Sequence, residues 1–296
     1  MNRPRLALAA VSVAAFATLG ACGSTTPAGP TLAATENGAG TGSGAPADAC
    51  AKASLPLVTS GKLTVGTDKP AYEPWFSKDD PSNGKGYESA VAFAAAEKMG
   101  FAKADVTWVV VPFNTAISPA AKTFDFDINQ ISISPERKNA VDFSSGYYDV
   151  RQAVVTYKGS PLDGKTTVAE LKEANLAAQV GTTSYDAIKN QIQPSNDPKV
   201  FDTNDLAVQA LKNKQIDGIV VDVPTAFYMV AAQLDDGVIV GQLPATGTPE
   251  QFGAVLDKGS ALTPCVSKAI DALRSDGTLD KLQQEYLANA GAPELK

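Results

Sequence analysis

Short apolar runs alternate with longer segments of helical spacing in the first half of the chain. Leu63–Thr67 predicts a strand, and residues 87–99 predict a helix that Gly100 ends. Residues 106–111 are β-branched and aromatic throughout, the pattern of a strand buried on both faces, and residues 126–133 predict a further short strand. Strands that alternate with helices favour βαβ units and a largely parallel sheet.

The alternation of strands and helices restarts in the second half of the chain. Strands are predicted at residues 176–180, 200–202, 216–221, 238–240 and 252–256. Helices are predicted at residues 184–191, 205–214, 224–232, 262–273 and 279–287. The chain therefore contains two α/β blocks, which join near residues 149–153.

Two α/β blocks predict two lobes, each a mostly parallel sheet flanked by helices. We assign residues 50–151 and 247–296 to the first lobe and residues 152–246 to the second, so the chain crosses between lobes at two hinges. Clefts at lobe boundaries, lined by the carboxyl ends of strands, are where small ligands bind. We expect the functional site in such a cleft.

The first residues have the character of an export signal. Arg3 and Arg5 precede an apolar run at residues 6–19, which is shorter than the ~20 residues of a membrane-spanning helix. The run ends in Leu-Gly-Ala before Cys22, which resembles a lipobox and implies cleavage before Cys22 and lipidation of its thiol. Residues 1–21 are then a lipoprotein signal peptide; the alternative is an ordinary secretory signal with an incidental cysteine.

Residues 22–49 are rich in Gly, Ala, Thr, Ser and Pro and have no apolar periodicity. Such a segment cannot bury a core, so we interpret it as a flexible tether between lipid and folded body. The predicted location is extracytoplasmic, at the membrane, through lipid on Cys22. In that compartment the other two cysteines, Cys50 and Cys265, are expected to form a disulfide; two buried free thiols are the alternative.

Composition and charge exclude several classes of function. Hydrophobic residues make up 44% of the chain and charged residues 19%, as in ordinary globular proteins. A net charge of −7 disfavours a nucleic-acid partner. The chain has no histidine, which excludes Ser-His-Asp and Cys-His catalysis and imidazole metal sites. We therefore predict no cofactor and no metal, and an enzyme would have to use carboxylates, Lys, Tyr or an isolated nucleophile.

One motif carries the most functional information. Residues 127–137, DINQISISPER, read as a strand that ends in hydroxyl side chains and then an arginine. Six further stretches accompany this motif along the chain, one before it and five after it: residues 65–68, 141–144, 147–148, 181–183, 220–222 and 276–279. Together they closely resemble solute-binding protein family 3, the polar amino-acid receptors of ABC transporters, over residues 61–288.

This resemblance implies a fold, a role and a partner. The fold is the type II periplasmic-binding-protein fold, with two lobes that close around a ligand. The role is capture of a polar L-amino acid for delivery to the permease subunits of an ABC importer. We expect a monomer.

Arg137 and Asp222 are the principal candidates for ligand binding. A planar guanidinium binds a carboxylate bidentately, and the family places its binding arginine at Arg137. The ammonium of an amino acid needs a carboxylate, and the family places its aspartate at Asp222, after a predicted strand. The alternatives are a surface salt bridge from Arg137 to Glu136 or Asp142, and a helix cap at Asp222.

Hydroxyl groups are expected to assist these two charges. Ser132 matches a family hydroxyl that holds polar groups of the ligand. Thr182 and Thr183 lie between a predicted strand and a helix, where they could add hydroxyls and backbone N–H groups. Simple N-capping of the helix is the alternative, and one residue can do both.

The remaining candidates concern the ligand side chain. The resemblance makes Tyr72 a stacking residue, while Phe113 is a second possible wall or a core residue. Asp68 matches a family position that contacts the ligand side chain, and a carboxylate there suits a cationic or amide group. Gln130 can donate and accept, so it leaves the charge of the ligand open. Trp75 matches a family aromatic that is usually core.

Two other functions compete with the binding role. A carboxylate-based enzyme such as a dehydratase could use the same fold, with Asp68, Glu73 or Asp222 as acid or base. No candidate has an obvious activating neighbour, which favours a binding protein over an enzyme. A sensor or adhesin could reuse the module, but no signalling segment follows Ala292, so we expect no fused sensor.

Overall fold

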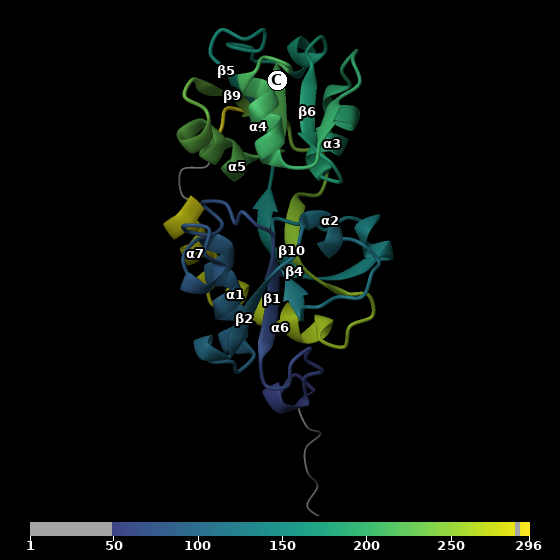
Figure 1. Ribbon diagram of the computed structural model, residues 1–296, viewed down its shortest axis with the longest axis vertical. Helices are drawn as coiled ribbons and strands as arrows, with labels where there is room; N and C mark the ends of the chain where they lie inside the picture. The colour runs from purple at the N-terminus through teal and green to yellow at the C-terminus, as the bar shows by residue number, and fades with distance from the viewer. Residues whose placement is uncertain (1–48, 288–290) are drawn as a thin grey trace, which may run out of the picture. The chain divides into compact units, whose positions relative to one another are not determined.

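A computed structural model describes residues 49–287 and 291–296. The predicted signal peptide, Cys22 and nearly all of the predicted tether lie outside the described residues. The described part contains two five-stranded sheets with flanking helices (Figure 1), so the predicted two-lobed α/β architecture is confirmed.

The first sheet has the strand order β2-β1-β3-β10-β4. Its strands are β1 (Leu63–Thr67), β2 (Val106–Val110), β3 (Phe126–Asp127), β4 (Val141–Val150) and β10 (Glu250–Asp257). β1 pairs in parallel with β2 and β3, whereas β10 runs antiparallel to β3 and β4.

The second sheet repeats this plan with the order β7-β6-β8-β5-β9. Its strands are β5 (Gln152–Tyr157), β6 (Leu176–Gln179), β7 (Lys199–Phe201), β8 (Gly218–Asp222) and β9 (Gly237–Gln242). β6 is parallel to β7 and β8, and β5 is antiparallel to β8 and β9. Each sheet thus joins a parallel part made of βα units to an antiparallel part.

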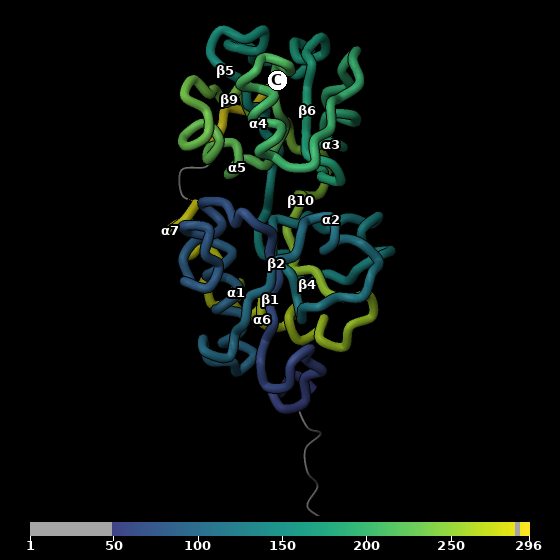
Figure 2. Tube along the Cα trace, in the orientation of Figure 1, coloured from purple at the N-terminus to yellow at the C-terminus, as the bar shows by residue number. Residues whose placement is uncertain are grey.

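Two strands of the antiparallel parts, β4 and β5, were not predicted from the hydrophobic pattern. β4 and β5 follow one another with only Arg151 between them, and they belong to different sheets. The chain crosses between sheets there and returns between β9 and β10 (Figure 2). β4 contains Asp142, three consecutive polar or small residues and two tyrosines, so its alternation is too irregular to indicate a strand.

The predicted strand at residues 126–133 is shorter than expected. Only Phe126–Asp127 forms a strand, and Ser132 makes an isolated bridge to Phe252. Gln130 has a φ of 48°, and a left-handed residue interrupts an extended run. The segment therefore turns at Gln130 and directs side chains away from the sheet.

Helices connect the strands close to the predicted positions. The α-helices are α1 (Tyr87–Lys98), α2 (Phe113–Ala116), α3 (Thr183–Ala187), α4 (Asn204–Lys212), α5 (Val223–Tyr228), α6 (Thr263–Ser275) and α7 (Thr278–Leu287). The π-helical turns Ile188–Ile192 and Met229–Gln233 extend α3 and α5. Short 3₁₀ turns lie at Lys52–Ser54, Pro81–Asn83, Lys103–Asp105, Arg137–Asn139 and Val168–Leu171. α2 was not predicted, because four residues are too short for a periodic pattern.

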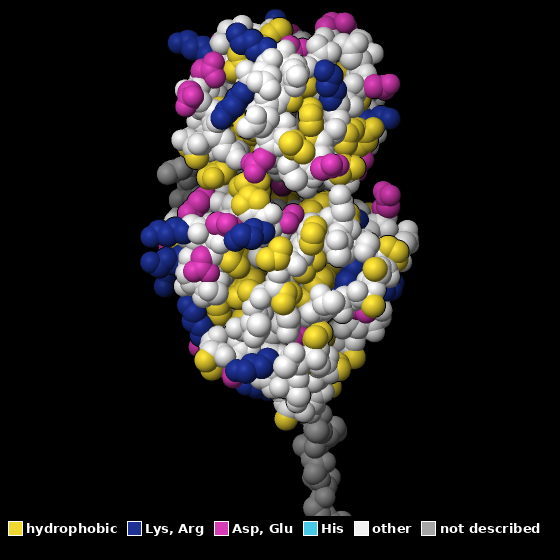
Figure 3. Space-filling model, in the orientation of Figure 1, with side chains coloured by type: hydrophobic (Ala, Val, Ile, Leu, Met, Phe, Trp, Pro, Cys, Tyr) yellow, Lys and Arg dark blue, Asp and Glu magenta, His cyan; other side chains and the backbone are white. Residues whose placement is uncertain are grey.

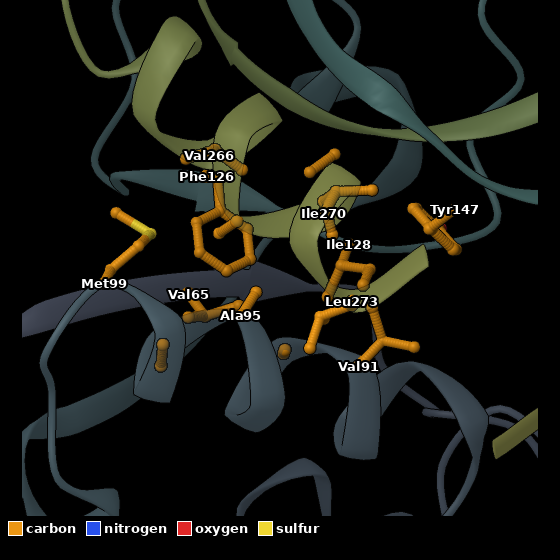
Figure 4. Packing of buried hydrophobic residues seen from close by; sticks show 14 of the residues in the cluster. Val65, Val91, Ala95, Met99, Phe126, Ile128, Tyr147, Val266, Ile270 and Leu273 are labelled. Carbon is orange, nitrogen blue, oxygen red and sulfur yellow. The ribbon is translucent and has the colours of Figure 1, made fainter. Parts of the chain in front are cut away.

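The core of the first lobe lies between its sheet and the helices α1 and α6. Figure 4 shows side chains from α1, including Val91 and Ala95, meeting Ile270 and Leu273 of α6 around Val65 of β1. These side chains are at most 1% exposed. Burying one large aliphatic side chain stabilises a fold by about 1.5–3 kcal/mol, so this contact fixes the helices on the sheet.

The second sheet is covered on both faces, as the alternation along β5 shows. Ala153 and Val155 pack with Ala207 and Leu211 of α4 on one face. Val154 packs on the other face, with the cluster that contains residues of α3. Successive side chains of a strand point to opposite faces, so one strand supplies both cores.

The last residues pack on the second sheet rather than on the first. Glu294 forms a parallel bridge with Gln242, and the Leu295 N–H donates to the Gln242 carbonyl at 2.9 Å. Leu295 is 2% exposed within the core of that lobe. The predicted assignment of residues 247–296 to the first lobe is therefore wrong for this final segment, whose apolar Leu295 needs a buried position. The other lobe boundaries stay a prediction.

The described surface mixes both signs of charge. Figure 3 shows Lys and Arg side chains interspersed with Asp and Glu side chains on the face drawn. Within the described residues, no helix combines the length and apolar character needed to cross a bilayer.

The structure contains a Cys50–Cys265 disulfide, with the two Cα atoms 5.3 Å apart. It links the start of the described chain to α6 across a sequence separation of 215 residues. A cross-link over so long a loop restricts the unfolded chain and stabilises the fold by up to about 5 kcal/mol through chain entropy.

Replacing both cysteines, Cys50→Ser with Cys265→Ser, should lower the melting temperature because the unfolded chain regains that freedom. Calorimetry of the variant beside the wild type would measure the change, with the wild type in reductant as the control. Equal melting temperatures, or two thiols alkylated in the unreduced native protein, would contradict this expectation.

Candidate functional site

A pocket opens where strands of both sheets end. It encloses about 660 Å³ of space outside protein atoms, and this volume includes the part that is open to solvent. Its lining comes from both lobes: Asp68, Pro70, Tyr72, Phe113, Asn129, Gln130, Arg137, Gln179, Thr182, Thr183, Ser184, Asn204, Val221, Asp222 and Thr225. Every residue predicted to bind the ligand lines the pocket except Ser132.

Arg137 lies between the two lobes with its guanidinium buried. Nη1 donates to the Ser132 carbonyl at 2.7 Å, and Nη2 donates to the Gly181 carbonyl at 2.8 Å. The Phe113 ring lies beneath it, with the centroid 5.4 Å from Cζ. Burial lowers the pKa of Arg137, but nearby Glu250 and Asp222 oppose the shift. A guanidinium has five N–H groups, so three remain for a ligand.

Asp222 ends β8 and reaches the pocket from the second lobe. It occupies the N-cap position of α5 but makes no capping hydrogen bond with its side chain. Its Oδ1 instead accepts from Gln152 Nε2 at 2.8 Å. Burial raises the pKa of Asp222 well above its usual range, the Glu250 charge adds to the rise, and the Gln152 hydrogen bond opposes it.

The three predicted hydroxyl residues meet at the boundary of the lobes. Ser132 Oγ lies 3.4 Å from Thr183 Oγ1, although Ser132 itself contributes only its carbonyl to Arg137. Thr182 caps α3, because its Oγ1 accepts from the Tyr185 N–H at 3.4 Å. Thr182 thus makes the expected cap and also lines the pocket.

Two aromatic residues, Tyr72 and Phe113, line the pocket. The Tyr72 and Tyr228 rings lie 6.1 Å apart, one from each lobe. Burial and a hydrogen bond to Asp205 raise the pKa of Tyr72. Trp75 is fully buried against Tyr148 and other rings, which confirms the expected core position.

The two predicted carboxylates near β1 have different surroundings. Asp68 lines the pocket and accepts from the Phe113 N–H at 3.2 Å. Glu73 accepts from the Lys78 N–H at 3.1 Å and does not line the pocket. Only Asp68 is therefore placed to face a ligand.

Glu88 of α1 supports the pocket from below and was not predicted. It is fully buried, and it accepts hydrogen bonds from the Gln130 N–H at 2.7 Å, from Gln130 Nε2 and from the Tyr147 hydroxyl. Burial raises its pKa to about 7, and these hydrogen bonds oppose the shift. Glu88 therefore holds Gln130 in its left-handed conformation. The two residues are 42 positions apart in the sequence, so no local sequence pattern links them.

Several pocket residues were outside the predicted set. Asn129, Gln179 and Ser184 are direct neighbours of predicted segments, so adjacency could have suggested them. Others come from α4 and α5, such as Asn204 and Thr225, and only the tertiary fold brings them in. Among the described residues, no group of three acidic or cysteine side chains could hold a metal ion.

The chain is similar in sequence to known proteins. Residues 63–289 match the bacterial extracellular solute-binding proteins, family 3. The probable histidine-binding protein of Campylobacter jejuni is 31% identical over 236 residues, which cover 77% of this chain and 86% of that protein. The arginine-binding extracellular protein ArtP of Bacillus subtilis is 27% identical and covers 76% of this chain and 86% of that protein.

The fold also matches solved structures. An ancestral arginine-binding protein bound to glutamine has a TM-score of 0.64 with this chain and 31% sequence identity. The match covers 78% of this chain and 100% of that protein.

Glu88→Gln should make the protein more stable at pH 8 but not at pH 4.5. The folded-state pKa of about 7 lies above the ordinary 4.5, so the unfolded chain releases the proton first as pH rises. The contribution of Glu88 to the free energy of unfolding therefore falls by about 3 kcal/mol between about pH 4.5 and pH 7, and it is constant above pH 7. A neutral amide removes that loss, and urea unfolding at the two pH values would measure it.

Glu97→Gln, at an exposed position of the same helix, is the matched control and should show no such difference. An equal effect of both substitutions, or a Glu88→Gln variant that is less stable at pH 8, would contradict the raised pKa of Glu88.

Proposed function

The chain belongs to the bacterial extracellular solute-binding proteins, family 3, and we propose that it captures a polar L-amino acid in the pocket between its lobes. One observation carries this proposal: a guanidinium and a carboxylate, Arg137 and Asp222, line one pocket from opposite lobes. An α-amino acid presents the complementary pair of charges on a single carbon.

The ligand's carboxylate would bind the N–H groups that Arg137 does not use for backbone carbonyls. Its two carbonyl partners, at Ser132 and Gly181, hold the guanidinium plane in place. The Thr183 hydroxyl also lines the pocket and can donate to the same carboxylate, whereas the Thr182 hydroxyl donates to the Gln179 carbonyl at 2.7 Å. The ammonium would replace the hydration that the Asp222 carboxylate loses on burial, the loss that raises the pKa of Asp222.

The lining favours a basic or amide side chain in the ligand. Asp68 supplies a carboxylate, and amides come from Asn129, Gln130, Gln179 and Asn204. Similar proteins are named for binding histidine or arginine, and a similar ancestral protein holds glutamine. Burying a mismatched apolar side chain against these groups would leave polar atoms unpaired, which sets the direction of selectivity.

The chain is a binding protein and not an enzyme, because its relatives are binding proteins of amino-acid transporters. It acts outside the cytoplasm, as its family does. We infer that the closed, ligand-bound form is presented to the permease of an ABC importer. One chain supplies both halves of the pocket, which supports action as a monomer, and lipid on Cys22 would keep it near the membrane.

The binding proposal predicts a rise in melting temperature with one or more basic or amide amino acids. A ligand at a hundredfold excess over its Kd adds ~2.7 kcal/mol to stability. A thermal-shift screen of the common amino acids, followed by calorimetry on each hit, tests this. Absence of any shift would count against the proposed function.

With the identified amino acid, Arg137→Ala and Asp222→Asn should each weaken binding at least thirtyfold. Each change leaves a buried ligand charge without its partner, which costs about 2–5 kcal/mol. Asp149→Asn, an exposed carboxylate on β4, is the matched control and should bind normally. Unchanged affinity in either pocket variant would remove that residue from the site.

Cys22→Ser tests the proposed anchor. The wild-type protein should sediment with membranes and carry the added mass of lipid, whereas the variant should remain in the soluble fraction. Equal partitioning of the two proteins would contradict lipidation at Cys22.

A further inference from the structure

Glu250 lies behind the pocket, at the point where the chain returns to the first sheet. It is the first residue of β10, directly after the second crossing. Gln152 is the first residue of β5, directly after the first crossing. The two crossings therefore place Glu250 and Gln152 side by side, and Gln152 Nε2 donates to Glu250 Oε2 at 3.2 Å.

The Gln152 amide joins this carboxylate to the pocket. The same Nε2 donates to Asp222 Oδ1 at 2.8 Å. Its orientation is fixed, because Gln152 Oε1 accepts from the Ser184 hydroxyl at 2.7 Å, and Gln152 is 4% exposed. Turning the amide over would set its oxygen against two carboxylates, so Gln152 holds both to one nitrogen.

Two carboxylates on one amide nitrogen repel each other strongly when water is largely excluded. Oε1 of Glu250 is buried and has no hydrogen-bond partner within the described part of the chain. At Oε1, therefore, no donor reduces the field of this carboxylate at Asp222. Among charged neighbours, Glu250 makes the largest contribution to the shift of Asp222.

We propose that Glu250 is a positioning residue for the proposed amino-acid site: through Gln152 it sets the charge of Asp222 and couples amino-acid capture to the release of a proton. The inference deepens the proposed function and rests on it. An ammonium group binds the ionised form of Asp222, so a proton on Asp222 must leave when the ligand enters. A second negative charge nearby makes that proton harder to remove from the empty site, and it moves the onset of proton competition to higher pH.

Other charged or titratable groups lie near Asp222 and Arg137, and these groups are unchanged in the variants used below. Around Asp222 these are Arg137, Glu88 and Tyr148; around Arg137 they include Asp186 and Glu136. Arg137 opposes Glu250, whereas Glu88 acts in the same direction. Replacing Glu250 alone therefore isolates its effect on Asp222.

The test is the pH dependence of the dissociation constant, measured by calorimetry from pH 8 to pH 4.5 with the amino acid found by screening. In the wild type, affinity should fall about tenfold for each pH unit below the midpoint of Asp222, since one proton competes with the ligand. In Glu250→Gln that fall should begin at a lower pH, because the neighbouring negative charge is absent. At acidic pH the variant should therefore bind several-fold more tightly than the wild type.

Proton release adds a second readout. Near the pH at which Asp222 is half protonated, the wild type should release a fraction of a proton for each ligand bound. This release makes the binding heat depend on the ionisation enthalpy of the buffer. Glu250→Gln should release less at the same pH. Glu294→Gln is the matched control, because it removes an exposed carboxylate that pairs with Arg151 beside the first crossing. Its profile should coincide with that of the wild type.

The outcomes separate the two proposals. If the dissociation constants of the wild type and Glu250→Gln depend on pH in the same way, with binding intact, the role of Glu250 is overturned and the proposed function stands. A uniform loss of affinity at every pH would indicate a purely structural role and would also overturn it. Failure of the wild type to bind any amino acid would overturn the proposed function and this inference together.

Discussion

The hydrogen bonds of Arg137 to carbonyls of both lobes are the interaction on which the site depends. A buried guanidinium is tolerated only when its N–H groups find acceptors, because an unpaired buried charge is far more costly than a hydrogen-bonded one. Ser132 supplies one acceptor from the first lobe and Gly181 supplies the other from the second. The same contacts that satisfy Arg137 therefore bring the lobes together around the pocket and leave N–H groups for a ligand.

Gly181 contributes to this arrangement through its lack of a side chain. Its φ is 72°, and an added Cβ would come within 2.9 Å of Asn114 Oδ1 in the first lobe. The turn before α3 can thus approach the first lobe closely and present its carbonyl to Arg137. A local property of the backbone in one lobe sets the distance between the lobes at the site.

Buried carboxyl groups lie close to the pocket. Asp222 and Glu250 share the Gln152 amide, and Glu88 lies buried beneath Gln130. Such groups reduce the stability of the empty protein near neutral pH, since burial penalises the charged form of each carboxyl. A cationic ligand group relieves that repulsion, so part of the cost to folding becomes selectivity for a positive charge.

The sequence by itself determined the α/β class, most helices and strands, and the principal charged residues. Regular apolar runs mark buried strands, and the resemblance to family 3 named Arg137, Asp222 and Asp68 in advance as residues that contact the ligand. Only the tertiary structure decided the antiparallel pairing of β4 and β5, because each pairs with a strand that lies far away in sequence. It also decided the roles of Glu88, Gln152 and Glu250. Their partners lie 42, 70 and 98 residues away in sequence, and a hydrogen bond over such a distance exists only once packing has closed the chain around it.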